Sequence, residues 1–419
     1  MTSLAARDRA YAAIDRPDAG LYCLLGACPA PWIDAHGMGA LADLCADKAE
    51  RRAQRLVALG LLDAVDGGFS LGPEGHLHAR IMADEWDGTG LGVDVSGLDR
   101  YFAFLNDAAG AAERLITPHH REMWGPDRVE EPGPAPFPLV EAAALDWLER
   151  NLPAYMAVMR FAYLDQRYPL CLDLAHRLWP LWLRRRHPVE RYEALSLGLA
   201  AASALRLVVA SGLMLTSLAW AVRSVRPSEA YEYDRRAVLI YQNADDTRGV
   251  AQAVNGMGKT LLYSGALYAA GAHFRDAEQL RAKIGDVRGT ALSRQGRGRV
   301  ALAQGDAAPA AELLADAHRM LLELGDYYNA ALTLAFHAEA LAAQGDLDGA
   351  LADLDTAATA LVQATSLYGQ GVVWRIRARI LHEAGREEQA QRAETHAQAL
   401  LAQLDPGAAD RAEPMDVAL

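Results

Sequence analysis

The sequence predicts an all-α protein, in which a solenoid of helical hairpins follows a small helical domain that ends in a β-hairpin. Small residues recur at fixed phase every 40 residues between positions 249 and 397, and glycines mark the expected helix ends. Near the start of the chain, three short helical segments precede a strand, a turn and a second strand. These two patterns define the predicted architecture.

The solenoid prediction rests on four copies of one unit that superpose by residue number alone. The small residues fall at four phases: Gly258, Gly298, Ala338 and Ala378; Gly265, Gly305, Gly345 and Gly385; Ala270, Ala310, Ala350 and Ala390; Ala277, Ala317, Ala357 and Ala397. Small side chains allow two helices to approach closely, and the second set places a glycine where a first helix ends. Each unit is therefore predicted to be a helical hairpin, and Ala230 and Ala237 indicate a degraded unit over residues 206–245.

This pattern resembles the tetratricopeptide repeat, which has small residues at its eighth, fifteenth, twentieth and twenty-seventh positions. Ala270 followed by Phe274 also matches the family's Ala-x-x-x-Phe step. The unit is 40 residues long where the usual repeat has 34. We interpret the surplus as a longer second helix or inter-repeat turn, marked by Gly285-Asp286 and Gly325-Asp326. The resemblance implies a right-handed solenoid whose concave face binds a peptide or protein, and it does not imply catalysis.

Composition bounds the function classes. A chain of 419 residues with 52% hydrophobic residues can bury a large core. Its formal charge of −13 argues against wholesale binding to nucleic acid or anionic membrane. Four cysteines without a Cys-x-x-Cys pair indicate reduced thiols in a cytoplasmic protein, with neither a zinc site nor a disulfide framework. The apolar run 207–222 contains polar residues and is interpreted as a buried solenoid helix, so no membrane partner is expected.

Residues 1–87 are expected to form a winged-helix-like domain. Segments 21–25 and 38–44 are short apolar helices, Asp47 would cap a third helix running to about Leu59, and strands 61–65 and 69–71 flank an Asp-Gly-Gly turn. A basic stripe on the third helix is a possible DNA-contact surface: Lys48, Arg51, Arg52 and Arg55. The alternative is a solvated helix face, because these 87 residues carry eight Lys/Arg against thirteen Asp/Glu.

The N-terminal half also resembles the part of actinobacterial STAND-type regulators that follows their NTPase module. The similarity lies in Leu24-Leu25-Gly26, the run from Leu56 to Asp63, Arg114-Leu115-Ile116-Thr117-Pro118 and the run from Ala144 to Leu152. Such regulators, often linked to antibiotic production, pass from a winged-helix-like domain through a helical linker into tetratricopeptide repeats. Leu71-Gly72-Pro73 replaces the family's Leu-His-Asp step, and these residues hold no NTPase module, so the resemblance does not extend to nucleotide-driven switching.

The remaining boundaries follow from glycine and proline. A linker over 88–138 has a glycine-rich start, an amphipathic helix from Leu98 to Ile116 and a proline-rich end. Irregular aromatic-rich helices over 139–205, broken near four prolines, lead into the repeats over 206–404, and 405–419 is expected to be a disordered tail. The aromatic residues of these helices are interpreted as core.

Several motifs resemble nucleotide-binding or metal-binding sites, but their surroundings in the sequence do not fit those functions. The segment 253–260 resembles a P-loop but begins with alanine and falls in mid-helix, so no nucleotide cofactor is expected. His119-His120 and the pair His76 and His78 lie outside any Cys/His cluster with ligand spacing, so no metal is expected. Neighbouring residues form no catalytic constellation, and catalysis is not the favoured interpretation.

The repeat register itself gives the candidate binding site. In tetratricopeptide repeats the fifth and ninth positions of the first helix face the groove. The polar residues at these positions are Asn255, Lys259, Gln295, Arg299, Glu339, Arg375 and Arg379, with Ala335 between them. Four cations and two amides would suit the carboxylates or carbonyls of an extended acidic peptide. The alternative is a set of ordinary solvated residues in which Glu339 pairs with an arginine.

The sequence therefore predicts a cytoplasmic, non-catalytic regulator or adaptor that binds a protein or peptide in its groove. One alternative is a small-molecule receptor or enzyme, in which the aromatic-rich helices 145–190 close over the groove to form a pocket. Another is a DNA-binding regulator that acts through helix 48–59. Control of transcription or secondary metabolism is the role that the resemblance implies.

Overall fold

The computed structural model describes residues 4–88, 96–124 and 133–404. Contacts divide the chain into two compact units, which are described separately. The first unit comprises Met1–Pro118 with Pro126–Leu178, and the second comprises His119–Gly125 with Trp179–Leu419. The predicted start of the repeats at residue 206 thus lies inside the second unit, where α11 (Pro188–Ala204) packs on α12 (Val208–Val222).

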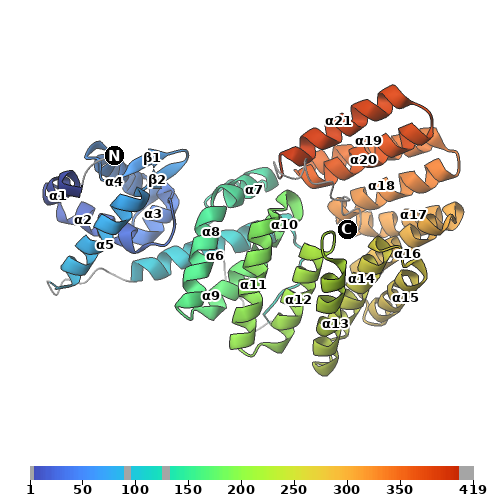
Figure 1. Cartoon of the computed structure of the whole chain (residues 1–419), viewed down its shortest axis with the longest axis horizontal. Coiled ribbons are helices and arrows are strands. Elements are labelled where there is room, and N and C mark those ends of the chain that lie inside the picture. The colour runs from blue at the N-terminus through green and yellow to red at the C-terminus, as the bar shows by residue number, and fades with distance from the viewer. Residues whose placement is uncertain (1–3, 89–95, 125–132, 405–419) are drawn as a thin grey trace. The chain divides into compact units, whose positions relative to one another are not determined.

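The first unit begins with four helices and a β-hairpin (Figure 1). Its elements are α1 (Leu4–Ala12), α2 (Arg16–Ala27), α3 (Ala35–Ala42), α4 (Ala46–Ala58), β1 (Asp63–Val65), β2 (Gly68–Ser70) and α5 (Gly72–Gly88). The strands pair antiparallel with Ala64 opposite Phe69, and Gly67 takes φ 77° in the turn between them. Ile33 adds an isolated bridge to Phe69. The helices α2, α3 and α4 and the hairpin follow the expected order, whereas α1 and the 17-residue helix α5 after the hairpin were not predicted. Tyr22, Met38, Leu41 and Leu56 are fully buried at the centre of this part.

One detail of this part differs from the prediction. Asp47 lies in the first turn of α4, and the N-cap position belongs to Cys45, whose side chain makes no capping hydrogen bond. Asp47 therefore contributes through the positive end of the helix dipole and not through a cap.

Four more helices belong to the described residues of the first unit. They are α6 (Ser96–Ile116), α7 (Glu141–Arg150), α8 (Leu152–Leu164) and α9 (Tyr168–Arg177). The amphipathic helix expected from Leu98 to Ile116 is confirmed as α6, which packs on α3 and α9. Polar atoms join these helices: Trp147 Nε1 donates to Asp34 Oδ2 at 3.1 Å, and Tyr155 Oη donates to the Leu105 carbonyl at 2.9 Å. Prolines stand in the first turns of α8 and α9, where a missing N–H costs no helical hydrogen bond.

The second unit is the solenoid. After α10 (Trp179–Arg185) and α11, the hairpins are α12 with α13 (Pro227–Asn243), α14 (Thr247–Tyr263) with α15 (Leu267–Lys283), α16 (Val287–Gln304) with α17 (Ala307–Glu323), α18 (Tyr327–Ala343) with α19 (Leu347–Gln363), and α20 (Leu367–Glu383) with α21 (Glu387–Ala402). Each hairpin packs on the next, so successive hairpins lie side by side (Figure 1). The degraded unit expected over 206–245 is confirmed as α12 and α13.

The 40-residue length has a different origin from the one that we expected. The paired helices are of nearly equal length, 17 or 18 residues each in α14 to α19, and the turns between them are short. The surplus therefore lies in both helices and not in the second helix or the turn alone. Gly265, Gly305, Gly345 and Gly385 take positive φ where first helices end, as the phase predicted.

Candidate functional site in the solenoid

The residues predicted to face a groove are largely paired with neighbouring repeats. Ser293 Oγ donates to Asn255 Oδ1 at 3.0 Å, and Gln295 Nε2 donates to Thr333 Oγ1 at 2.8 Å, with both amide side chains buried. Ala335 is fully buried. The Arg299 guanidinium lies 4.3 Å from the centre of the Phe336 ring. These side chains join each first helix to the next one.

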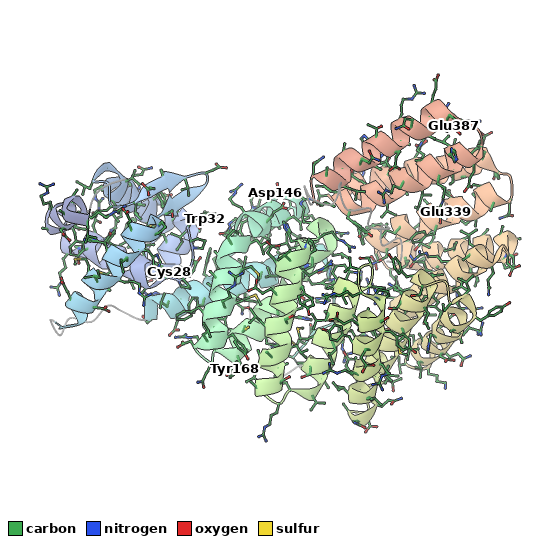
Figure 2. The ribbon with its side chains drawn as sticks, viewed as in Figure 1. Cys28, Trp32, Asp146, Tyr168, Glu339 and Glu387 are labelled. Carbon is green, nitrogen blue, oxygen red and sulfur yellow. The ribbon has the colours of Figure 1, made fainter. Side chains whose placement is uncertain are left out.

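The last hairpin holds two of the predicted residues, Arg375 and Arg379, in a groove between α20 and α21. This terminal groove has a volume of 510 Å³ and is lined on α20 by Val372, Arg375, Arg379 and His382, and on α21 by Glu387, Gln391 and Glu394. Arg375 Nε lies 3.8 Å from a Glu394 oxygen, and Arg379 forms an ion pair with Glu339 of α18. Figure 2 labels Glu339 and Glu387. The groove thus presents both signs of charge. The ion pair between Arg379 and Glu339 agrees with the alternative prediction, in which Glu339 pairs with an arginine.

Lys259 and Asp234 belong to a charged cluster inside the first two hairpins. Asp234 of α13 is buried and lies 3.4 Å from Arg223, while Arg223 also donates to Thr260 at 3.1 Å. Burial raises the pKa of the Asp234 carboxyl to about 7, and the charges of Arg223 and Lys259 oppose that rise. The segment 253–260 is confirmed as the middle of α14, which is not the strand-to-helix loop that a P-loop requires.

A regular ladder of polar pairs runs along the start of the first helices. Arg248 Nε lies 3.8 Å from Asp286, and Arg288 Nε lies 2.7 Å from Asp326. Both aspartates are N-cap residues that also accept a backbone N–H of their own helix. One and two periods after Arg288, the same phase holds Tyr328 and Tyr368. The residue at this phase is therefore an arginine in α14 and α16 and a tyrosine in α18 and α20.

Three consecutive arginines, Arg184 to Arg186, lie beside the two tyrosines at this phase. The guanidinium carbon of Arg184 lies 3.8 Å from the centre of the Tyr328 ring, and that of Arg186 lies 3.9 Å from Tyr368. Arg185 donates from NH1 to the Thr365 carbonyl at 2.6 Å. Sequence reasoning missed this segment; the available signal was three adjacent arginines in an acidic chain, together with two tyrosines 40 residues apart.

The same segment also contacts the first hairpin. Trp220 of α12 lies 5.1 Å from the guanidinium of Arg186 and 4.4 Å from that of Arg191. Arg191 donates from NH2 to the Ala221 carbonyl at 2.8 Å. A residue that touches both α12 and α20, the first helices of the first and last hairpins, can do so only from the inside of a curved stack. Arg186 therefore marks the inner face of the solenoid.

The basic stripe of the first unit is partly neutralised. Arg55 forms two hydrogen bonds with Asp18 of α2, at 2.8 and 2.7 Å, and Arg52 Nε lies 3.8 Å from the same carboxylate. Lys48 and Arg51 are exposed on α4. DNA contact through these residues stays a prediction.

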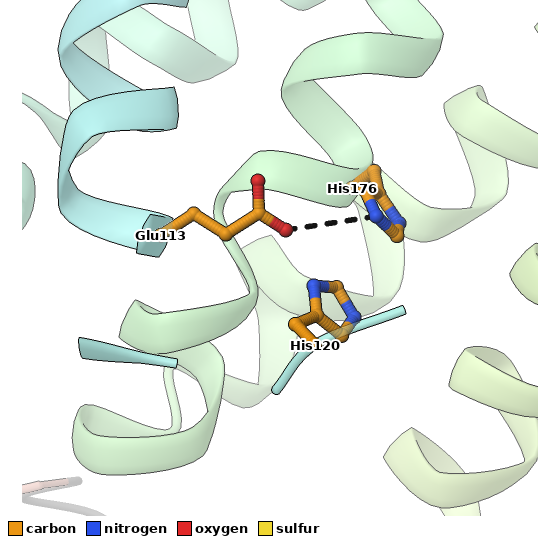
Figure 3. Close-up of side chains that lie close together, drawn as sticks. All are labelled: Glu113, His120 and His176. Carbon is orange, nitrogen blue, oxygen red and sulfur yellow. Dashed lines mark ion pairs between the residues drawn. The ribbon is translucent and has the colours of Figure 1, made fainter. Parts of the chain in front are cut away.

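The histidines considered as metal ligands lie in different surroundings. His78 is buried and joins Tyr22 Oη at 2.9 Å to Asp8 Oδ1 at 3.0 Å, whereas His76 is half-buried and burial lowers its pKa. In the first unit, His176 Nε2 lies 3.6 Å from Glu113 Oε1 (Figure 3). Figure 3 also draws His120, which belongs to the second unit and stacks there on Trp179 at 5.1 Å.

No protein-family model and no curated protein sequence matches the chain. Similar solved structures include a Rap protein complexed with competence and sporulation factor (TM-score 0.48, 11% identity, covering 78% of this chain and 93% of that one). Aspartyl phosphate phosphatase F from Bacillus subtilis is similar with a TM-score of 0.43 and 10% identity, covering 93% of this chain and 95% of that one. A third similar structure is a Signal Transduction ATPase with Numerous Domains (STAND) protein with a tetratricopeptide repeat sensor from Pyrococcus horikoshii. Its TM-score is 0.38 and its identity 12%, covering 94% of this chain and 66% of that one.

By its own helix order and by the packing of successive hairpins, the chain is an all-α protein with a solenoid of tetratricopeptide-like repeats. Within the part of the chain that the structure describes, none of the helices combines the length and apolar character needed to span a bilayer.

Proposed function

We propose that this chain is a non-catalytic regulatory adaptor that binds a protein or peptide partner on the inner face of its solenoid. The observation that carries the proposal is the stack of five hairpins, whose first helices provide one continuous surface. Stacked repeats create extended binding surfaces of this kind. The terminal groove, with Arg375 and Arg379 opposite Glu387 and Glu394, adds charged groups that can hydrogen-bond to a peptide.

We further propose that this adaptor acts in the control of transcription or secondary metabolism. It is supported by the resemblance to actinobacterial STAND-type regulators and by the order of helices and hairpin at the start of the first unit. On this proposal the domain over residues 1–87 is a winged-helix-like module and the partner belongs to the transcription machinery or its regulators.

The proposal is tested by recovering the tagged full chain from its own cells after nuclease treatment and identifying bound proteins by mass spectrometry. A partner present in near-stoichiometric amount is expected. It should be lost or reduced with the double variant Arg375→Gln/Arg379→Gln and retained with Arg319→Gln, which changes an exposed arginine of α17. Recovery of no protein, or of a small molecule alone, would instead support the receptor or enzyme alternative, which remains a prediction.

DNA binding through α4 is a second candidate, favoured by the exposure of Lys48 and Arg51 on one helix face. Asp18 weighs against it because its carboxylate already pairs with Arg52 and Arg55 and offsets part of their charge. If α4 binds a duplex, affinity should fall steeply with salt and fall again in Lys48→Gln/Arg51→Gln. Fluorescence anisotropy with a labelled duplex measures both, and absence of binding at low salt rules the candidate out.

A further inference from the structure

The terminal groove lies where the plan of the stack places one more helix. At each earlier junction a first helix packs on the hairpin before it: α18 packs on α16 and α17, and α20 packs on α18 and α19. The last hairpin lies at one end of this row (Figure 1). Among the described residues, no helix follows α21 to cover its groove of 510 Å³. The terminal groove is therefore the counterpart of a position that the stack itself fills with one helix.

The counterparts of the groove residues, one period earlier, lie under α20. Ala335 and Leu354 are fully buried in a core cluster that also contains Val373 of α20. Glu339 forms an ion pair with Arg379 of α20. The groove residues at the same three phases are Arg375, Glu394 and Arg379. These phases are therefore the ones through which a hairpin receives the next helix.

The junction between α16 and α18 shows which groups such a helix brings. Thr333 of α18 accepts a hydrogen bond from Gln295 at 2.8 Å, and the Phe336 ring lies 4.3 Å from the guanidinium carbon of Arg299. The groove residues at the phases of Gln295 and Arg299 are Arg375 and Arg379. A helix in the terminal groove would thus meet an arginine at both positions, where a carboxylate and an aromatic ring are the complementary groups.

Both arginines can reach such a helix while they keep their present partners. The side chain of Arg379 is 54% exposed although it pairs with Glu339, so an aromatic ring can pack on its guanidinium. Arg375 Nε lies 3.8 Å from Glu394, which is beyond hydrogen-bond distance. A ligand carboxylate can therefore add a closer charge-assisted hydrogen bond to Arg375.

The composition of the terminal groove suits an interface that forms and separates. Val372 and Ile376 are buried and provide an apolar floor. The charged residues around this floor are Arg375 and Arg379 on α20, and Glu387 and Glu394 on α21. An apolar centre with a polar rim is typical of interfaces between separately folded partners. Charge alone would keep the end of a stack soluble, and the groove adds a place for a ligand.

We infer that the terminal groove binds one amphipathic helix of the partner, which packs there as α18 packs on α16 and α17. This helix places a carboxylate at Arg375 and an aromatic ring on Arg379, and its apolar side covers Val372 and Ile376. The inference rests on the proposed function and names the binding element of the partner as a helix, whereas the repeat register suggested an extended acidic peptide.

The probe is a labelled synthetic peptide with the sequence of residues 326–344, which comprises α18 and its N-cap, carrying Thr333→Glu. Fluorescence anisotropy at low salt should show that it binds the full chain. Adding Phe336→Ala to the peptide should weaken binding by at least about threefold, because the ring on Arg379 is lost. Adding Ala335→Pro should weaken it by at least about tenfold, because proline breaks the helix. Absence of binding, or equal binding of the proline peptide, would overturn the inference.

Variants of the chain then locate the site. Arg375→Gln/Arg379→Gln should weaken binding of the probe by at least about tenfold. Arg319→Gln is the matched control and should leave affinity unchanged. The gain from Thr333→Glu in the peptide should disappear in Arg375→Gln, which a double-mutant cycle measures. If circular dichroism shows that the double variant is unfolded, this cycle decides, and a gain that persists in Arg375→Gln would contradict the inference.

Two other occupants of the groove would give different results. If sedimentation shows that the chain self-associates and that Arg375→Gln/Arg379→Gln makes it monomeric, a second copy occupies the groove and the inference is wrong. If the probe binds only after residues 405–419 are removed, the chain's own C-terminal residues occupy the groove, and the inference is again wrong.

The outcome also separates this inference from the proposed function. A protein partner recovered from cells, together with no binding of the probe, would refute the helix site and leave the adaptor function standing. Binding of the probe as expected, together with no protein partner from cells, would support the helix site and refute the adaptor function.

Discussion

Asp234 and Arg223 form a buried ion pair whose free energy depends on pH. Both side chains are almost fully buried between α12 and α13, and the Arg223–Asp234 distance of 3.4 Å is long for a charge-assisted hydrogen bond. Desolvation therefore outweighs attraction, and the pKa of Asp234 rises to about 7. We therefore expect this pair to contribute little to the free energy of unfolding.

The variant Asp234→Asn tests this balance. The folded chain holds the Asp234 proton up to about pH 7, whereas the unfolded chain releases it near pH 4, so this group's contribution to stability falls as pH rises between these values and is constant above them. The stability of the natural chain relative to Asp234→Asn should therefore decline by on the order of 3 kcal/mol across that window. Chemical denaturation from pH 4.5 to 8 measures the difference. A difference that is flat or rises with pH would contradict the assignment.

The hairpins depend on glycines where helices approach most closely. A Cβ on Gly296 of α16 would lie 2.4 Å from a ring carbon of Phe274, which is fully buried on α15. A Cβ on Gly271 of α15 would meet no atom closer than 3.4 Å, which is ordinary van der Waals contact. Both glycines lie within helices, so only their packing differs.

This contrast gives a matched pair of substitutions. Gly271→Ala should stabilise the chain by about 0.5–1 kcal/mol, because alanine has the higher helix propensity. Gly296→Ala should destabilise it by about 1–3 kcal/mol, because the ring of Phe274 has to move in a packed core. Thermal denaturation compares the two. Equal shifts in Tm would mean that helix propensity, and not the close approach to Phe274, decides the result.

Sequence periodicity identified the elements well, because a packing constraint that repeats every 40 residues is visible as small residues at fixed phase. The hairpin at Asp66-Gly67, the helix starts at Pro153, Pro169, Pro180 and Pro188, and the positive φ at Gly265 all follow from local chemistry. The contacts of Arg184 and Arg186 could not be predicted in this way. They join residues separated by well over a hundred positions, which only the curvature of the stack brings together.

The register places the polar residues on the first helices but does not tell which of them form hydrogen bonds between repeats. Asn255 and Gln295 lie at the expected phase, and their partners Ser293 and Thr333 lie one period apart in the following first helices. Whether such a polar residue faces a ligand or the next helix depends on the side chain opposite it. That information is absent from the phase of a single helix.

The second unit is a stack in which each hairpin contacts its neighbours. Among the described residues, the last hairpin therefore packs on one other hairpin. In such an array stability is the sum of repeat and interface terms, and the ends open most easily. Arg186 adds a contact of a different kind, since it touches Trp220 in the first hairpin and Tyr368 in the last. It therefore ties the two ends of the stack from within.

Removing the contacts of Arg186 should make local opening of the last hairpin more frequent, with little effect on the middle hairpins. In Arg186→Ala, amide hydrogen exchange in α20 and α21 should become faster by about tenfold, because each lost cation–π contact is worth about 0.5–2 kcal/mol. Exchange in α14 to α17 should change little, since those helices keep both neighbours. Arg235→Ala, which changes an exposed arginine paired with Glu232 on α13, is the matched control. Mass spectrometry of exchanged peptides resolves these segments, and unchanged exchange in α20 and α21 would show that contacts between adjacent hairpins alone hold the end of the solenoid.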